Sequence, residues 1–244
     1  MLLPDCCRGR QVHVLIAIAI FVFFDLITWR VDYLSKPFKL LAVFVHEASH
    51  ASACFLTGGS VSSLEVNINE GGTTKYSGGY QRIITPAGYI GGAFWGAVGL
   101  CCVATTYGQY ILTAILATAL VITLFATLFC SRNNVENPFT TGLVCIFFVI
   151  ILVALILLHV FVASDALLYG LLFIVTYISL FSSFDIYDDC VRRYVKNGGS
   201  QSDAVVCERL CPILPARGHG CVWFLISLAF WFLGICLCLS ILDD

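Results

Sequence analysis

The sequence predicts an all-α polytopic membrane protein of about seven transmembrane helices, with a short β-hairpin-like segment after the second. The composition is the first reason, because 59% of the 244 residues are apolar and only 11% are charged. An ordinary soluble domain has about 25% charged residues. The second reason is that apolar runs of about 17–25 residues, long enough to cross a bilayer as helices, recur along the chain. Residues 1–244 are therefore expected to form a single membrane-embedded domain.

The apolar runs define seven expected spans, at residues 12–29, 40–57, 85–106, 110–130, 141–163, 166–184 and 221–242. The fifth and sixth runs are separated only by Ser164 and Asp165, which predicts a tight helical hairpin. The third run contains Gly88, Gly92 and Gly96. Their spacing of four residues predicts a small-residue face against which another helix packs closely.

Two longer polar segments separate these spans. After the second span, a short apolar alternation precedes Gly71–Gly72, which predicts a strand, a turn and a second strand. This hairpin is either an ordinary loop or an element near the functional site, where its edge could pair with an extended substrate. The second polar segment, residues 185–220, is expected to be a cytosolic loop.

The distribution of positive charge predicts the orientation in the membrane. Seven spans put the N-terminal tail and the segments after the second, fourth and sixth spans on one side, which then holds ten of the 13 Lys and Arg residues. Cytoplasmic segments carry an excess of Lys and Arg. The N-terminus is therefore expected in the cytosol and the C-terminus on the other side of an endomembrane or the plasma membrane.

The second span holds the most informative motif, His-Glu-Ala-Ser-His at residues 46–50. On a helix, residues four apart lie on the same face, so His46 and His50 can bind one ion. A glutamate between two such histidines, here Glu47, is typical of zinc hydrolases. An ionisable group inside a span costs about 2.5–3.5 kcal/mol and usually marks function. The alternative is a buried hydrogen-bond cluster of the same side chains.

A catalytic zinc usually takes three protein ligands and one water. The third ligand must lie at the depth of the two histidines. The sixth span ends on the same side as the second, and Asp185 marks that end. Asp185 is therefore the preferred third ligand, and Asp188, one helical turn later, is the second candidate. His159 and Asp165 lie near the opposite face and are poor candidates.

The ordered motifs HEASH, TGGSVSSLEV, EGGTTKYSGG, TPAGYIGGAFWG, SSFDIYDDCVRR and SQSDA extend over residues 40–204. With them the chain resembles the site-2-protease class of intramembrane zinc metalloproteases, and more closely its peptidase M50B-like branch. The resemblance implies Zn²⁺ bound by His46, His50 and an aspartate from a later helix, most simply Asp185, with Glu47 as catalytic residue. It also implies a membrane-associated β segment. The chain has F-D-I-Y-D-D where well-studied members of that class have L-D-G. Asp185 and Asp188 therefore both remain candidates for the third ligand.

The expected function is hydrolysis of peptide bonds in or near transmembrane segments of membrane-protein substrates. The expected partners are those substrate spans and the lipid bilayer, and the net charge of −2 gives no reason to expect nucleic acid. One alternative is an inactive relative with a binding or regulatory role. Another alternative is a ceramidase-like lipid amidohydrolase, a class that needs more histidines within its spans. The three other histidines of this chain, His13, His159 and His219, all lie near predicted membrane boundaries, which makes this class a poor fit. A transporter is a further alternative, although no internal repeat supports it.

Overall fold

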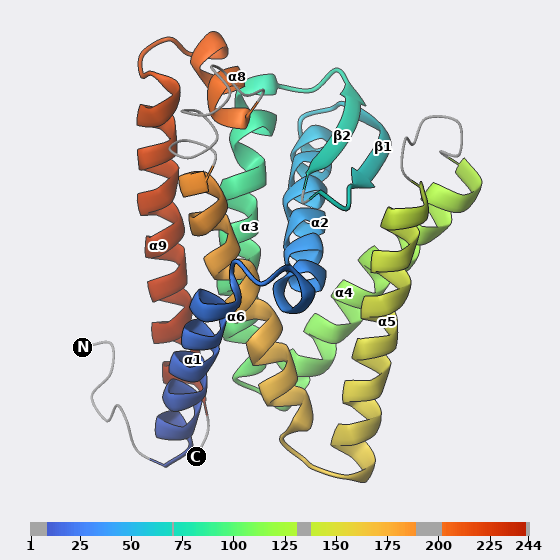
Figure 1. Ribbon diagram of the computed structural model, residues 1–244, viewed down its shortest axis with the longest axis vertical. Helices are drawn as coiled ribbons and strands as arrows, with labels where there is room; N and C mark the ends of the chain where they lie inside the picture. Colours follow the sequence, from blue (N-terminus) through green and yellow to red (C-terminus); the bar gives the residue numbers. More distant parts are fainter. Residues whose placement is uncertain (1–8, 70, 131–137, 189–201, 243–244) are drawn as a thin grey trace.

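A computed structural model describes residues 9–69, 71–130, 138–188 and 202–242 of the chain. Figure 1 shows an elongated helical bundle with a small β-hairpin at one end. In chain order the elements are α1 (Gly9–Thr28), α2 (Asp32–Leu56), β1 (Ser60–Val66), β2 (Gly72–Ser77), α3 (Gln81–Val103), α4 (Thr106–Phe125), the π-helix η1 (Ala126–Cys130), α5 (Pro138–Phe161), α6 (Ala166–Tyr187), α8 (Asp203–Leu210) and α9 (Ala216–Ile241). The expected helical architecture and the hairpin after the second helix are confirmed.

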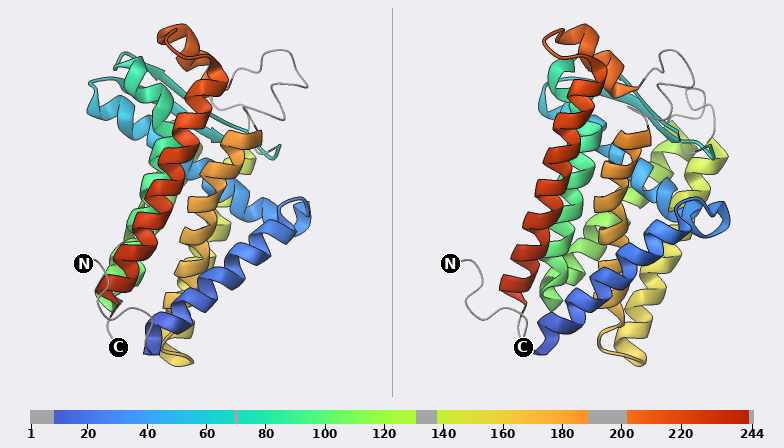
Figure 2. Two further views of the ribbon diagram at one scale, coloured as in Figure 1. Left: turned by 90° about the vertical axis from the view of Figure 1, so that its left-hand side faces the viewer. Right: turned by 60° about the vertical axis from the view of Figure 1, so that its left-hand side comes forward.

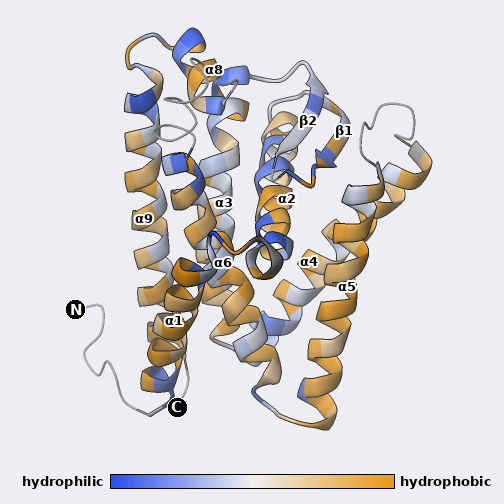
Figure 3. Ribbon diagram, in the orientation of Figure 1, coloured by the Kyte–Doolittle hydropathy of each residue, from blue (hydrophilic) through white to orange (hydrophobic). Residues whose placement is uncertain are grey.

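Six described helices are long and apolar enough to cross a membrane, namely α1, α3, α4 with η1, α5, α6 and α9. The chain is therefore a multi-pass membrane protein. Figure 3 shows hydrophobic residues along these helices, while hydrophilic residues gather around α8 and the hairpin at one end. The six helices correspond to six of the seven expected spans. The predicted loop at 185–220 contains the short helix α8 and the first residues of α9.

The second expected span differs from the prediction. Helix α2 carries Lys36 and Lys39 as well as the His-Glu motif, and it is not among the six candidate spans. It begins close to the end of α1, partway along the bundle, and continues toward the hairpin end (Figure 2). Together α1 and α2 therefore extend from one end of the bundle to the hairpin end (Figure 2). The start of α1 and the end of α9 consequently lie at the same end of the bundle, whereas seven spans would place them at opposite ends (Figure 1).

Helix α6 is the central helix of the bundle, and 78% of the residues in its most apolar 18-residue stretch are buried. Helix α3 packs closely against it through the predicted small-residue face. A Cβ on Gly92 would lie 2.7 Å from the Ser182 hydroxyl of α6, and a Cβ on Gly96 would overlap Ser179. The packing role of these two glycines is therefore confirmed. Gly88, the third of the series, instead faces the histidines of α2.

The hairpin packs on α2 and is also tied to α5. Strands β1 and β2 pair antiparallel, with Leu64 opposite Thr74 and Val66 opposite Gly72. The backbone N–H of Val66 donates a 2.9 Å hydrogen bond to the Thr141 hydroxyl at the start of α5. Because side chains alternate along a strand, Gly72, Thr74 and Tyr76 share one face of β2. That face meets α2, since Thr74 bonds to Glu47.

Candidate metal centre

The two histidines lie on the face of α2 that meets α3. His50 is buried with 6% exposure, and the His46 and His50 rings lie edge to face with centroids 4.8 Å apart. A Cβ on Gly88 of α3 would overlap the Nε2 atoms of both rings. Glycine at this position is therefore what allows α3 to approach the two imidazoles closely.

Neighbouring groups on α3 fix the orientation of each ring. His50 Nδ1–H donates a 2.7 Å hydrogen bond to the Ile84 carbonyl, which leaves Nε2 as the atom facing His46. A hydrogen bond of this kind is the usual way in which proteins orient an imidazole toward a metal. The His46 ring packs edge to face against Tyr89, with centroids 4.8 Å apart. These contacts with α3 orient the two rings.

The third group of the cluster is Asp203, the first residue of α8. Its Oδ2 atom lies 3.1 Å from the Nε2 atom of each histidine, and the two Nε2 atoms are 3.1 Å apart. Burial alone raises the pKa of the Asp203 carboxyl. The charge of His50 and hydrogen bonds from both histidines outweigh that effect, so the pKa lies well below its usual range. Asp203 is therefore ionised at neutral pH, as a metal ligand must be.

The geometry of this triangle fits a zinc ion. Ligands about 2.1 Å from a tetrahedral ion are separated from one another by about 3.4 Å. The observed separations of 3.1 Å are only a few tenths of an ångström smaller. Two imidazole nitrogens and one carboxylate oxygen are also a donor set found in catalytic zinc sites, where a fourth position holds water. Among the described residues, His46, His50 and Asp203 form the group of possible metal ligands.

Asp185, the preferred ligand in the sequence analysis, lies elsewhere. It is in the last turn of α6, close enough for its charge to act on His46, but it contributes no ligand atom to the group of three. Asp188 lies at the end of the same helix and is also outside the group. The histidines thus meet an aspartate 18 residues beyond Asp185, because α8 folds back over α3. Depth estimated from the spans could not reveal this return of the chain.

The position of Asp203 depends on the turn between α8 and α9. His219 Nε2–H donates to the Cys211 carbonyl at 3.2 Å, and its Nδ1 atom lies 3.7 Å from the Cys207 sulfur. At the start of α9, the backbone N–H of Ala216 donates a 3.0 Å hydrogen bond to the Glu208 carboxylate. Trp223 of α9 stacks on Tyr89, the residue that also contacts His46. Contacts on α3 and α9 therefore hold α8 beside the histidines.

Glu47 is held by β2. Its side chain is 6% exposed, and the Thr74 hydroxyl lies 2.7 Å from Oε2 and donates to it. A Cβ on Gly72 would overlap the Glu47 side chain, so glycine makes room for the carboxylate. The sequence did not identify Thr74 or Gly72 as site residues, although both lie in the predicted hairpin. Glu47 therefore lies between the two histidines in sequence, but its carboxylate is held by the hairpin, whereas the histidine rings are oriented by α3.

Comparison with known proteins gives one match. The family model described as Peptidase M50B-like matches residues 14–234, which include all the residues of the metal cluster. Searches of curated proteins and of solved structures find no match. Because the family match covers nearly the whole chain, the protein belongs to the Peptidase M50B-like family.

Proposed function

We propose that the protein is an intramembrane zinc metallopeptidase that hydrolyses peptide bonds in or near transmembrane segments of other membrane proteins. The observation that carries the proposal is the convergence of His46, His50 and Asp203, beside Glu47, within a bundle of candidate membrane spans. Membership of a peptidase family agrees with this assignment. We propose these three residues as the zinc ligands, so Asp203 takes the place expected of Asp185.

When bound, zinc would supply Lewis-acid polarisation of the scissile carbonyl and a bound water of lowered pKa. Glu47 acts as the general base that takes a proton from this water and later gives it to the leaving amine. Thr74 donates to Oε2 of Glu47, which leaves Oε1 to carry the proton. The hydrogen bond also keeps the carboxylate from rotating away during the reaction. His50 stays aligned through its bond to the Ile84 carbonyl.

The hairpin is the proposed element that holds the substrate extended. A peptide bond within a helix is shielded by the helix's own hydrogen bonds, so the substrate segment must unwind locally. A two-stranded sheet has free outer edges that can pair with an extended chain. Val66 of β1 is already bonded to Thr141 of α5, whereas β2 lies against Glu47. The outer edge of β2 is therefore the proposed pairing edge.

The six candidate spans change the proposed orientation. The start of α1 and the end of α9 lie at one end of the bundle. At this end, Arg10 of α1 pairs with Asp165 of the α5–α6 turn at 2.6 Å. Among the described Lys and Arg residues, four lie at the hairpin end of the bundle, namely Lys75 of β2, Arg82 in the first turn of α3, Arg209 of α8 and Arg217 in the first turn of α9, whereas Arg10 lies at the opposite end. By the excess of positive charge, we propose that the metal centre faces the cytosol and the N-terminus does not. The membrane is proposed to be an endomembrane or the plasma membrane.

Replacement of Glu47 by Gln tests the function directly. We expect the purified variant to retain zinc, because the three ligands are unchanged, and to cleave a membrane-spanning reporter about 10²–10⁴-fold more slowly. Zinc is measured by atomic emission and cleavage by mass spectrometry of the products. Glu65→Gln is the matched control, because Glu65 is a buried carboxylate of the hairpin that pairs with Lys75 and is absent from the ligand group.

Undiminished cleavage by the Glu47→Gln variant would overturn the assignment of this residue. A wild-type protein that contains zinc but cleaves no membrane-spanning reporter would instead favour the non-proteolytic alternative. The two measurements together therefore separate a metallopeptidase from a metal-binding relative that lacks activity.

A further inference from the structure

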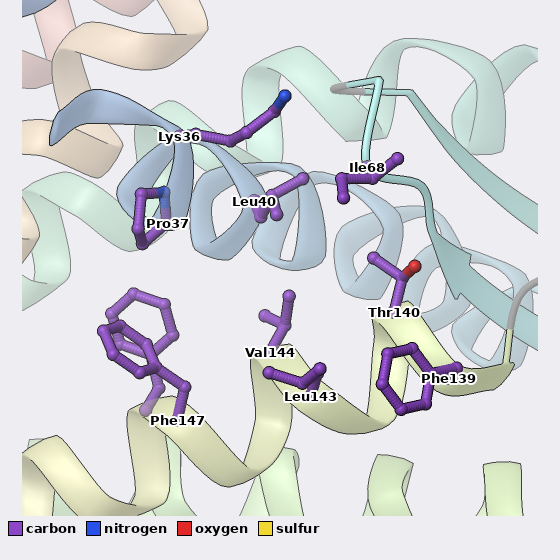
Figure 4. A pocket seen from close by; sticks show the side chains of 10 residues that line it. Lys36, Pro37, Leu40, Ile68, Phe139, Thr140, Leu143, Val144 and Phe147 are labelled. Carbon is purple, nitrogen blue, oxygen red and sulfur yellow. The ribbon is translucent and has the colours of Figure 1, made fainter. Parts of the chain in front are cut away.

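A cavity of about 620 Å³ lies between α2 and α5, beside the loop that joins β1 to β2. Figure 4 shows Lys36 and Leu40 on the α2 side, Ile68 at the hairpin, and Phe139, Leu143 and Phe147 on the α5 side. Its volume is within the range of about 300–1,000 Å³ that is usual for ligand pockets. The cavity is separate from the metal cluster, since none of the three ligands lines it. We call it the α2–α5 groove.

The groove is open to the hydrocarbon region. Helix α5 is a candidate span, and its lining residues Phe139 and Leu143 are 78% and 50% exposed. Exposed apolar side chains on a membrane-spanning helix face lipid. A molecule that moves within the bilayer can therefore enter the groove without passing through water.

The groove lies on the face of α2 that also carries Glu47. Leu40 lines it and Glu47 lies seven residues later, two helical turns and about 10 Å along the same face. On the other wall, the chain continues from Ile68 into β2, which bonds to Glu47 through Thr74. An extended polypeptide that occupies the groove would thus point along α2 toward the catalytic carboxylate and the proposed pairing edge.

One charged side chain lies at the α2 rim of the groove, and its ammonium group is directed away from α5 (Figure 4). Lys36 lines the groove, and in Figure 4 its ammonium group is directed toward the side where Ile68 lies. The described part of the chain gives Lys36 no ion-pair partner. A positive charge near hydrocarbon is costly unless it is paired or reaches the interface. The groove therefore complements an apolar ligand that carries one negative charge.

We propose that the α2–α5 groove is the docking site for the substrate's transmembrane segment, and that it selects segments with an acidic residue that pairs with Lys36. This inference rests on the proposed peptidase function and adds a substrate class to it. A lipid acyl chain would also fit the apolar walls. The position of the groove on the face of α2 that carries Glu47, next to the hairpin, favours a polypeptide over a lipid.

Photo-crosslinking tests the docking site without requiring cleavage. The Glu47→Gln protein is reconstituted in phosphatidylcholine vesicles with a synthetic Leu/Ala-rich single-span peptide. The peptide carries a diazirine residue and either Glu or Lys at the position that would lie beside Lys36. We expect the Glu peptide to label residues 138–147 about two- to fivefold more than the Lys peptide, the range of a partly exposed charge pair. Lys36→Glu is expected to reverse this preference.

Two matched tryptophan variants test the groove itself. Leu143→Trp fills the groove and is expected to abolish labelling at residues 138–147. Leu157→Trp places the same bulk on the same helix at nearly the same exposure, 51% against 50%, but outside the groove. It is expected to leave labelling unchanged. Equal labelling by the Glu and Lys peptides, or labelling that Leu143→Trp does not reduce, would overturn the proposal.

A parallel experiment with a photoreactive lipid tests whether a lipid, rather than a peptide, occupies the groove. Vesicles that contain a photoreactive phosphatidylserine replace the peptide, and strong lipid labelling of residues 138–147 without peptide labelling would also overturn the proposal. Cleavage by the wild-type protein is measured separately on the same peptides. Peptide docking without any cleavage would retain the groove and reject the peptidase, so the two proposals fail in distinguishable ways.

Discussion

The two sides of the metal cluster are supported very differently. His46 and His50 lie within α2, a helix of 25 residues, and are oriented by groups of α3. Asp203 begins a helix of eight residues that is held by the turn into α9. The two histidines therefore belong to a long helix of the bundle, whereas Asp203 belongs to a short helix that packs on the end of the bundle. Among the three proposed ligands, the aspartate is therefore expected to change position more readily than the two histidines.

Removal of the carboxylate is expected to have the largest effect on metal binding. Loss of a group that only orients a ligand costs about 10–100-fold in metal affinity. Asp203→Ala removes a ligand itself, so we expect zinc affinity to fall by more than about 100-fold. Asp185→Ala is expected to retain zinc, because Asp185 is outside the ligand group. Competition with a chromogenic chelator measures both, and the reverse result would restore Asp185 as the third ligand.

Distortion of the histidine side is expected to have the next largest effect. Alanine at Gly88 places a methyl group on the Nε2 atoms of both histidines. We expect zinc affinity to fall by about 10–100-fold, as for other disturbances of ligand orientation. In Gly92→Ala the methyl group meets only the Ser182 hydroxyl at 2.7 Å. That side chain can rotate, so zinc binding should be retained.

Thermal unfolding of both glycine variants shows whether any loss is local. A Gly88→Ala protein with normal zinc affinity would show that the two rings are less constrained than the structure indicates. Comparable loss of zinc in both variants would point to general disruption of the α3 interface with α6.

Weakening the attachment of α8 is expected to have the smallest effect. His219→Ala removes a hydrogen bond to the Cys211 carbonyl, worth about 0.5–1.5 kcal/mol or roughly 2–12-fold in affinity. We expect zinc affinity to fall within this range and amide exchange to accelerate in α8 but not in α2. His159→Ala is the control, because His159 pairs with Tyr110 between α5 and α4. Equal exchange rates in α8 of wild type and His219→Ala would contradict an anchoring role for His219.

Local sequence was sufficient for the histidine side and the hairpin. The i, i+4 spacing of His46 and His50 places them on one face of any helix that forms, and the chain around them is apolar enough to form one. Likewise, Gly71–Gly72 ends an alternating apolar run, and the strands form on either side of it. The partner of the carboxylate Glu47 could not be predicted, because Thr74 reaches it only when β2 folds back over α2.

The path through the membrane shows the same limit. Residues 40–57 have the length of a span, but the helix that contains them begins at Asp32, close to the end of α1 and partway along the bundle. Hydropathy measures the cost of placing a segment in lipid and does not measure where the segment begins in depth. The count of six candidate spans rests on helix length and composition, which leave out α2 with its lysines and His-Glu motif, and the proposed reversal of the N-terminus rests on that count.

The sequence by itself determined the membrane class, the family resemblance, and the three motif residues His46, Glu47 and His50. The membrane class depends on composition, the motif residues on spacing within one or two helical turns, and the resemblance on the ordered motifs over residues 40–204. Only the tertiary structure decided that Asp203 faces the histidines and that Gly88 makes room for them. The reason is that Asp203 lies 153 residues after His50, so their contact depends on how α3, α8 and α9 pack together. The motif SQSDA contains Asp203, but its sequence alone does not show that this residue meets the histidines.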